Sequence, residues 1–132
     1  DYSVAAYSVG GSQVAAAYEC AGFFNFSNSC RPMPEQKAKG FVNYIDDKHN
    51  FYGAINYISS YYDRRDSKNV EDHRTIDATY TYSIDESMDI AISVYNVFDN
   101  LPPAVNWEMN YDAYTHSPLG RYIKAGFTYR LQ

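Results

Sequence analysis

The chain contains 132 residues with a formal net charge of −5, and 17 % of its residues are aromatic because it holds 15 Tyr, 7 Phe and 1 Trp. The acidic balance, without a basic stripe, argues against binding to nucleic-acid phosphates, and the absence of a run of about 18 apolar residues argues against a transmembrane helix. Abundant Tyr favours β strands and half-hydrated surfaces, including membrane interfaces.

The N-terminal part of the sequence contains one strand-like run and both cysteines. Asp1–Val9 is short and ambiguous, and a strand-like start without a signal peptide favours a processed chain or a fragment. Cys20 and Cys30 lie in the long polar link Gly10–Glu35. Because no His or further Cys lies near them, a zinc site is disfavoured, and a Cys20–Cys30 disulfide is favoured over two free thiols. Such a bond predicts an oxidising compartment.

Four central segments alternate between apolar and polar residues with a period of two, which is typical of strands. They are Gln36–Ile45, Phe51–Tyr61, Thr75–Ile84 and Met88–Val97. The third is the clearest, because every second residue from Ile76 to Ile84 is apolar and the residues between them are polar. No segment combines a 3.6-residue apolar stripe with helix caps. The sequence therefore predicts an antiparallel β meander.

The last segment, from Gly120 to Gln132, is the most informative one. One row of alternate residues is apolar, and the other row carries polar or charged side chains: Ile123, Ala125, Phe127, Tyr129 and Leu131 oppose Tyr122, Lys124, Gly126, Thr128 and Arg130. This arrangement is typical of a strand between lipid and a wet lumen. A strand of a soluble β sandwich has the same pattern when it is taken alone.

Short and long connections alternate along the chain. Tight turns occupy residues 46–49 and 85–87, whereas long polar links cover 10–35, 62–72 and 98–119. Outer-membrane barrels combine short periplasmic turns with long extracellular loops, and counting strands back from the C-terminus places every long link outside. The predicted fold class is all-β, an antiparallel meander of five to six strands that forms part of a larger transmembrane β-barrel.

Strands in register would merge the alternating rows into two faces, because adjacent antiparallel strands place side chains of the same parity side by side. We therefore expect one continuous lipid-facing surface from Ile76, Ala78, Tyr80, Ile90, Ile92, Val94, Ile123, Ala125, Phe127 and Tyr129. On the opposite face we expect a charge ladder from Asp77, Asp89, Lys124 and Arg130.

Two of the polar links hold candidate ligand-binding residues. The loop 106–114 combines aromatic rings with amides and carboxylates, which can stack on sugar rings or catechols and orient them by hydrogen bonds. The alternative is a loop that packs on its own aromatics. The tip 63–66 carries adjacent Arg residues suited to an anionic ligand, and the alternative is a solvated, self-paired turn. The candidate ligand-binding residues are Trp107, Tyr111, Tyr114, Arg64 and Arg65.

The sequence offers no catalytic or metal-binding motif. It lacks a Gly-x-Ser-x-Gly elbow and a phosphate-binding glycine loop, and its carboxylate pairs fall in tight turns. His49, His73 and His116 lie on three different connections, and the alternating strand ends keep His49 away from the other two. We therefore expect no enzymatic activity, no metal site and no cofactor.

Three stretches of the sequence resemble the C-terminal end of TonB-dependent outer-membrane receptors. They are the strand end Val94–Pro103, the loop segment Thr115–Arg121 and the final aromatic strand. Receptors of this family are barrels of about 22 strands with a plugged lumen. The resemblance implies that residues 1–132 form the C-terminal portion of such a barrel, without the plug domain and earlier strands. The chain departs from the family pattern at Gln132, where an aromatic residue is usual.

The resemblance also implies a function. A receptor of this kind imports a scarce ligand, such as a siderophore, cobalamin or an oligosaccharide, across the outer membrane of a Gram-negative bacterium. The implied partners are outer-membrane lipid, the rest of the barrel and its plug, TonB through the missing N-terminal part, and the small-molecule ligand, but no nucleic acid. One alternative is a soluble secreted β-domain that binds a small ligand or acts as an adhesion module. A second alternative is a porin-like channel, whose parent protein would have no plug.

Overall fold

The structure is a computed structural model and describes residues 3–4, 7–9, 12–15, 18–24, 31 and 33–131. All regular elements in these residues are β strands, and the same residues contain no helix long and apolar enough to cross a membrane. The chain divides into two compact units. The loop unit comprises Asp1–Lys37, Ile58–His73 and Pro102–Pro118, and the sheet unit comprises Ala38–Tyr57, Arg74–Leu101 and Leu119–Gln132.

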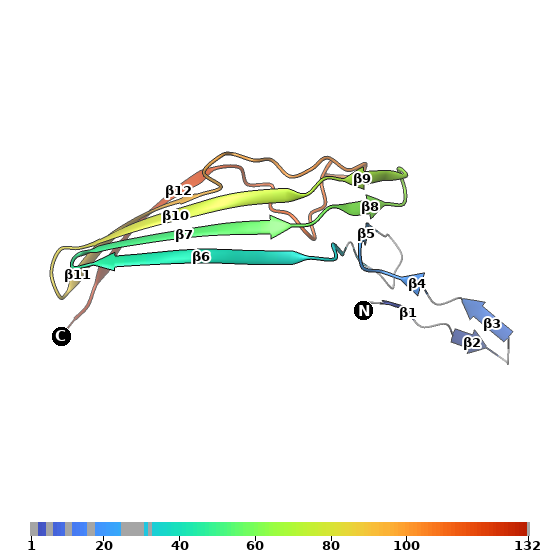
Figure 1. Cartoon of the computed structure of the whole chain (residues 1–132), viewed down its shortest axis with the longest axis horizontal. Coiled ribbons are helices and arrows are strands. Elements are labelled where there is room, and N and C mark those ends of the chain that lie inside the picture. Colours follow the sequence, from blue (N-terminus) through green and yellow to red (C-terminus); the bar gives the residue numbers. More distant parts are fainter. Residues whose placement is uncertain are drawn as a thin grey trace. The chain divides into compact units, whose positions relative to one another are not determined.

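The sheet unit is built on a five-stranded sheet in the order β12-β11-β10-β7-β6. Neighbouring strands run in opposite directions (Figure 1). The strands are β6 (Lys37–Asp46), β7 (His49–Ile58), β10 (His73–Ser83), β11 (Met88–Tyr95) and β12 (Tyr122–Tyr129). Each of them falls on one segment that alternates with a period of two in the sequence. The predicted all-β class is therefore confirmed, and the five-stranded sheet is an antiparallel meander, although the described chain also contains further short strands outside this sheet.

Tight turns join neighbouring strands at one end of the sheet (Figure 1). Between β6 and β7 the backbone of Asp47 is left-handed, with a φ of 45°, a conformation that Asp tolerates in turns. Between β10 and β11 the Ser87 N–H donates to Asp85 Oδ1 (2.7 Å). This side-chain bond replaces a backbone one and fixes the turn, as expected for an Asp in that position.

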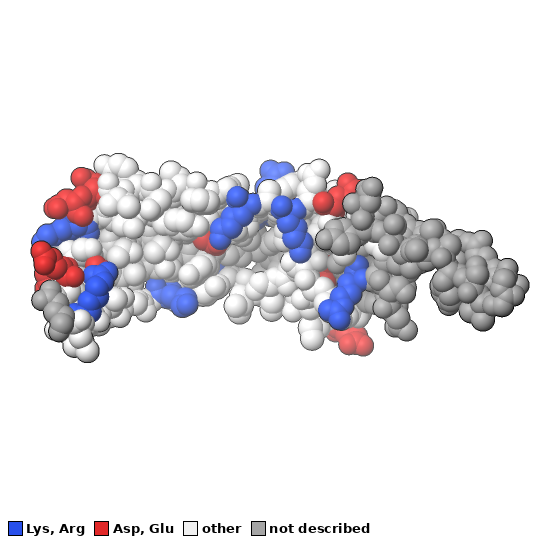
Figure 2. Space-filling model, turned by 90° about the horizontal axis from the view of Figure 1, so that it is seen from below, with Lys and Arg blue, Asp and Glu red and all other residues white. Residues whose placement is uncertain are grey.

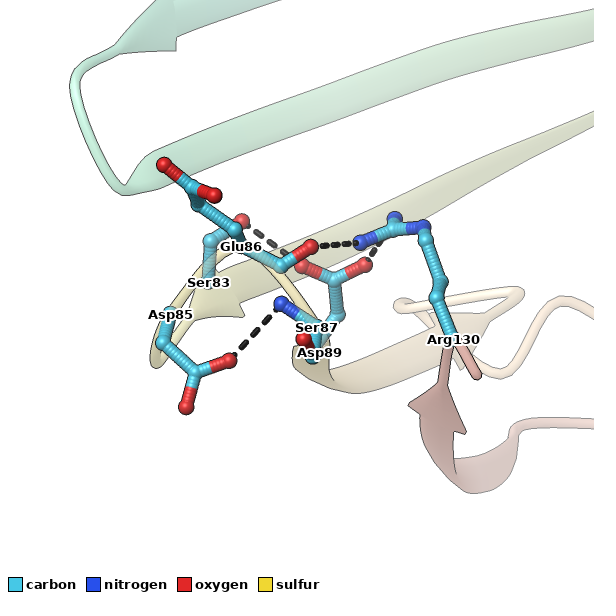
Figure 3. Close-up of polar contacts among 6 residues, drawn as sticks. All are labelled: Ser83, Asp85, Glu86, Ser87, Asp89 and Arg130. Carbon is cyan, nitrogen blue, oxygen red and sulfur yellow. Dashed lines mark hydrogen bonds and ion pairs between the residues drawn. The ribbon is translucent and has the colours of Figure 1, made fainter. Parts of the chain in front are cut away.

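An ion pair secures the end of the last strand next to these turns. Arg130 pairs with the Asp89 carboxylate, which also accepts a hydrogen bond from the Ser83 hydroxyl (2.7 Å) (Figure 3). The Arg130 backbone N–H donates to Ser87 O (2.8 Å), and its guanidinium donates to Glu86 O (3.3 Å). From the predicted charge ladder, the structure thus joins Asp89 and Arg130 into a pair that links β10, β11 and the residue after β12.

A buried Asn closes the opposite end of β11. Asn96 is 6 % exposed and left-handed, with a φ of 51°. Its side chain exchanges two hydrogen bonds with the backbone of Asn100: Nδ2 donates to the carbonyl (2.9 Å), and Oδ1 accepts from the N–H (3.0 Å). The Asn96 backbone N–H donates to Asp77 Oδ1 (3.0 Å). The stretch Val94–Pro103 therefore forms a hydrogen-bonded corner against β10.

The loop unit contains a smaller, three-stranded sheet with its own core. β5 (Phe23–Phe24) runs parallel to β8 (Tyr61–Asp63), and β8 pairs antiparallel with β9 (Lys68–Val70). The hydrophobic core around this sheet consists of Phe24, Tyr61, Val70 and Val105. Two further pairs join β1 (Ser3–Val4) to β4 (Tyr18–Glu19) and β2 (Tyr7–Val9) to β3 (Ser12–Ala15).

Short strands therefore occur where the sequence predicted irregular links. The prediction of one strand over Phe51–Tyr61 was wrong at its C-terminal end, because β7 ends at Ile58 and Tyr61 begins β8. The links 10–35 and 62–72 likewise contain short strands. A strand of two or three residues is too short to show a period of two, so its pairing depends on contacts that are distant in sequence.

Candidate functional site

The register of the sheet brings three apolar rows side by side. Tyr80 of β10 lies opposite Ile92 of β11, which in turn lies opposite Ala125 of β12. The same alignment holds along the strands and confirms that the predicted rows are adjacent. We call this surface the apolar face; on these three strands it comprises Ile76, Ala78, Tyr80, Tyr82, Ile90, Ile92, Val94, Ile123, Ala125, Phe127 and Tyr129.

The apolar face continues across β7 and β6. The ring centroids of Phe51 and Tyr80 are 4.7 Å apart, and those of Tyr44 and Phe51 are 6.4 Å apart. Farther along the same strands, an open apolar groove is lined by Gly40, Phe41, Val42, Gly53, Ala54, Ile55 and Ile76. All five strands therefore contribute to one apolar surface.

Large apolar side chains on this face are exposed. The exposed fractions are 68 % for Val42, 49 % for Ile92, 68 % for Ile123 and 64 % for Phe127. A contiguous exposed patch of this kind is typical of a surface that meets a partner or a membrane, because isolated domains rarely leave such patches in water.

Across β10, β11 and β12 the opposite face of the sheet is polar, whereas on β6 it also carries the exposed Phe41 and Ile45. Asn56 Nδ2 donates to Asp77 Oδ2 (2.9 Å), and the Thr79 hydroxyl donates to Ser93 Oγ (2.9 Å). Ser93 also lies opposite Lys124 in the register. Figure 2 shows acidic and basic side chains gathered at the turn end of the sheet, beside a surface of uncharged residues. Over β10, β11 and β12 the sheet thus separates an apolar surface from a polar one.

Two segments of the loop unit that are distant in sequence meet at an open hollow. Among the described residues, its lining comprises Arg65, from the turn between β8 and β9, and Asn106, Trp107 and Glu108. Asn106 Nδ2 donates to Asp66 Oδ1 (2.9 Å) and so ties the two segments together. The structure therefore unites Arg65 and Trp107, which the sequence placed in separate links.

Aromatic packing fixes the orientation of Trp107. Its ring stacks on Tyr114 with centroids 5.3 Å apart and meets Phe24 edge-on at 6.0 Å. The Arg31 guanidinium lies over the Tyr114 ring, 5.2 Å from its centroid. Tyr114, a predicted ligand-binding residue, therefore supports the Trp107 ring but is not itself in the described lining of the hollow.

The other two predicted ligand-binding residues lie elsewhere in the loop unit. The Arg64 guanidinium is 3.8 Å from the ring centroid of Phe23, in a cation–π contact. Tyr111 forms an antiparallel bridge with Ala104, and its hydroxyl contacts Met109 Sδ (3.7 Å). The structure does not place Arg64 and Tyr111 in the lining of the hollow.

Sequence reasoning missed a buried polar cluster in the loop unit. The Tyr61 hydroxyl donates to Asp112 Oδ2 (2.9 Å) and lies 3.1 Å from His116 Nε2. All three side chains are buried. Asp112 Oδ1 accepts a hydrogen bond from the Tyr114 N–H (2.9 Å). The cluster fastens the segment 102–118 to β8. Its one signal in the sequence is that Asp112 and His116 are four residues apart, the spacing of one helical turn. The His116 N–H donates to Asp112 O (2.9 Å) and closes that turn.

Burial controls the protonation of this cluster. Burial, followed by the charge of Asp112, raises the pKa of Tyr61. Burial, followed by the neighbouring His73, lowers the pKa of His116 to about 4, and the two imidazole centroids are 5.1 Å apart. His116 is therefore neutral at physiological pH. Within the described part of the chain, no three His, Cys, Asp or Glu side chains are grouped to hold a metal ion.

Cys20 is buried and disulfide-bonded. Its predicted partner, Cys30, lies outside the described residues. The pairing of Cys20 with Cys30 therefore stays a prediction.

Comparisons of the chain with protein-family models, with characterised proteins and with solved structures gave no significant match.

Proposed function

We propose that this chain is the C-terminal barrel portion of a TonB-dependent outer-membrane receptor, which imports a scarce small molecule across the outer membrane of a Gram-negative bacterium. The observation that carries the proposal is the exposed apolar face of a five-stranded sheet, opposed on β10, β11 and β12 by polar side chains. In a membrane barrel, apolar side chains face the lipid and polar side chains face the water-filled lumen. The sequence resemblance at Val94–Pro103 and in the last strand points to the same family.

Strand length supports this proposal. β6 and β7 have 10 residues each, β10 has 11, and β11 and β12 have 8 each. A tilted strand needs about 9–11 residues to cross the hydrocarbon core of a bilayer. The five strands are therefore close to the length that a membrane barrel requires.

Aromatic residues near the tight turns give further support. His49 Nδ1 lies 2.7 Å from the Tyr80 hydroxyl, and the His49 ring centroid is 5.2 Å from that of Tyr82. Phe51 packs on the same Tyr80 ring. Rings with one polar end favour the level of the lipid headgroups, where they combine apolar contact with hydration.

The long links supply the proposed ligand contacts. Arg65 and Trp107 line the hollow of the loop unit, and Tyr114 supports the Trp107 ring. In this proposal the remaining partners are outer-membrane lipid, the other barrel strands and the plug, and TonB through the N-terminal part of the receptor. The chain itself carries no catalytic role.

A single Trp, substituted at one of two neighbouring positions, tests the lipid contact. In a Trp107→Phe background, which removes the sole Trp of the chain, a single Trp replaces either Ile92 on the apolar face or Ser93 on the polar face. The chain is refolded into phosphatidylcholine vesicles with brominated acyl chains, which quench Trp fluorescence on contact. We expect strong quenching for Ile92→Trp and weak quenching for Ser93→Trp, because successive strand residues point to opposite faces.

The pair Ile123→Trp and Lys124→Trp repeats the comparison on β12. Equal quenching at both positions of each pair would contradict a lipid-facing surface. A monomeric chain that dissolves without detergent and does not associate with the vesicles would favour the soluble secreted β-domain instead.

A further inference from the structure

The hollow beside Trp107 has an unusual chemical mixture. It combines an indole ring with a guanidinium from Arg65, an amide from Asn106 and a carboxylate from Glu108. The carboxylate only accepts hydrogen bonds, the guanidinium only donates them, and the amide does both. The hollow therefore offers donors and acceptors around an aromatic surface.

We propose that this hollow binds a neutral saccharide, with one sugar ring packed on Trp107. Every sugar hydroxyl is both a donor and an acceptor, so a ligand with several adjacent hydroxyls matches the mixture of Arg65, Asn106 and Glu108. The apolar C–H face of a pyranose matches the exposed part of a half-buried indole. The inference rests on the proposed function, because it takes the long links as the ligand-contacting part of the receptor.

The charges of the described lining residues, one Arg and one Glu, disfavour an anionic ligand. A ferric siderophore or a phosphate compound carries negative charge, and Glu108 would repel it at close range. A site for anions gathers several cations instead. Asp66, which holds Asn106 in place, pairs with Lys68 (3.6 Å), so the two together add no net positive charge next to the lining. A neutral ligand meets no such penalty.

Two lining side chains, Trp107 and Asn106, are held in place before a ligand arrives. Trp107 is held by Tyr114 on its face and by Phe24 at its edge, and Phe24 is fully buried. Asn106 is held by Asp66 through a hydrogen bond of 2.9 Å. Because these side chains are already ordered, binding requires little further loss of conformational freedom.

The sole Trp makes the test direct. The full chain is refolded in lauryldimethylamine oxide, since alkyl-glycoside detergents would compete for the site. It is titrated with glucose, galactose, mannose, xylose and their disaccharides, while the fluorescence of Trp107 is recorded. We expect a saturable change with at least one of these sugars and a dissociation constant of about 0.1–10 mM, as suits an open site with few contacts.

Substitutions assign the response to the hollow. Glu108→Gln and Arg65→Gln should each weaken binding about tenfold, since each removes a charged hydrogen-bond partner. Arg64→Gln is the matched control, because Arg64 lies over Phe23 outside the lining, and it should leave the constant unchanged. Trp107→Ala should abolish binding in saturation-transfer NMR, and circular dichroism verifies that this variant folds.

Three results would overturn the inference: no sugar of the panel binds, the hollow variants bind as well as the wild type, or only inorganic phosphate or gallium catecholate gives a saturable signal. The vesicle experiment with Ile92→Trp and Ser93→Trp is separate from these titrations. If the sheet contacts lipid but no sugar binds, only the saccharide proposal is refuted. If a sugar binds but the sheet does not contact lipid, only the proposal of a membrane receptor is refuted.

Discussion

The carboxylate of Asp99 accepts a hydrogen bond from the backbone N–H of Arg121, 22 residues farther along the chain (2.6 Å). Arg121 immediately precedes β12, and its guanidinium donates to Val97 O (3.3 Å). Gly120 fits closely beside this contact, since a Cβ at that position would collide with Asp99 Oδ1. The corner after β11 therefore fixes the point at which the last strand enters the sheet.

Asp99→Ala should destabilise the sheet unit by about 1 kcal/mol, because it leaves an N–H at the start of β12 without its charged acceptor. Hydrogen exchange of the β12 amides provides the measurement, and they should exchange about fivefold faster at this free-energy loss. Asp46→Ala, which removes an exposed acid at the turn end of β6, is the control. Equal protection of β12 in both variants would show that the corner does not position the strand.

Ile92→Arg should destabilise the chain in a bilayer by about 2–4 kcal/mol, because it places a charge in hydrocarbon. Ser93 is the next residue and lies on the polar face, where water and Asp carboxylates can stabilise a positive charge. Ser93→Arg should therefore destabilise the chain much less. Reversible urea unfolding of the vesicle-bound chain compares the two variants. The opposite ranking would mean that the polar face, and not the apolar face, contacts lipid.

His116 should make the loop unit sensitive to acid. Its folded-state pKa is lowered to about 4 from the ordinary 6.5, so the folded state favours neutral imidazole. The stabilisation is complete above the unfolded-state pKa and is lost as the pH falls from 6.5 through 4, by roughly 3 kcal/mol in total. Urea unfolding followed by Trp107 fluorescence at a series of pH values measures the loss.

Two variants separate His116 from other acid effects. His116→Gln keeps a hydrogen-bonding group near Tyr61 but does not titrate, so its stability should depend much less on pH in this window. His49→Gln changes a histidine of the sheet unit, and the stability of this variant should depend on pH as that of the wild type does. If all three proteins show the same pH profile, His116 is not the group that titrates.

The disulfide predicts a redox dependence. Cys20 is already bonded in the structure, and the sequence predicts Cys30 as its partner. Thiol titration of the unfolded chain without reductant should therefore find no free thiol, and peptide mapping should recover one cross-linked peptide with both residues. Breaking the bond should lower stability by roughly 2–3 kcal/mol in the chain-entropy description. Two titratable thiols would contradict the prediction.

The five long strands were predictable because each contains enough residues to repeat its alternation. The alternation of apolar and polar residues around Ile92 and Ser93 predicted which side chains lie on each face of β11. The apolar row of β12 was then expected to lie beside the apolar row of β11, as the register shows. The turn residues Asp47 and Asp85 were predictable as well, since their role is local.

The loop unit was not predictable in the same way. Its cluster joins Tyr61 to His116, 55 residues apart, through side chains that lie in short or irregular segments. No periodic pattern connects such residues, so the sequence placed Tyr61 at the end of a long strand and His116 on a connection. The hollow was predicted only in part. Arg65 and Trp107 were each predicted to bind a ligand, but no feature of a single sequence indicates the Asn106–Asp66 contact that brings their segments together.

The two outer strands of the sheet affect how the chain must be handled. β6 and β12 each have a neighbour on one side only in the described sheet, so each presents a row of backbone donors and acceptors along its other side. Such rows accept a strand from any other chain, including a second copy, and the exposed apolar side chains beside them strengthen that association. Preparations of the isolated chain should therefore precipitate or form fibrils as their concentration rises, and dilution with a detergent present before denaturant removal should favour the folded monomer.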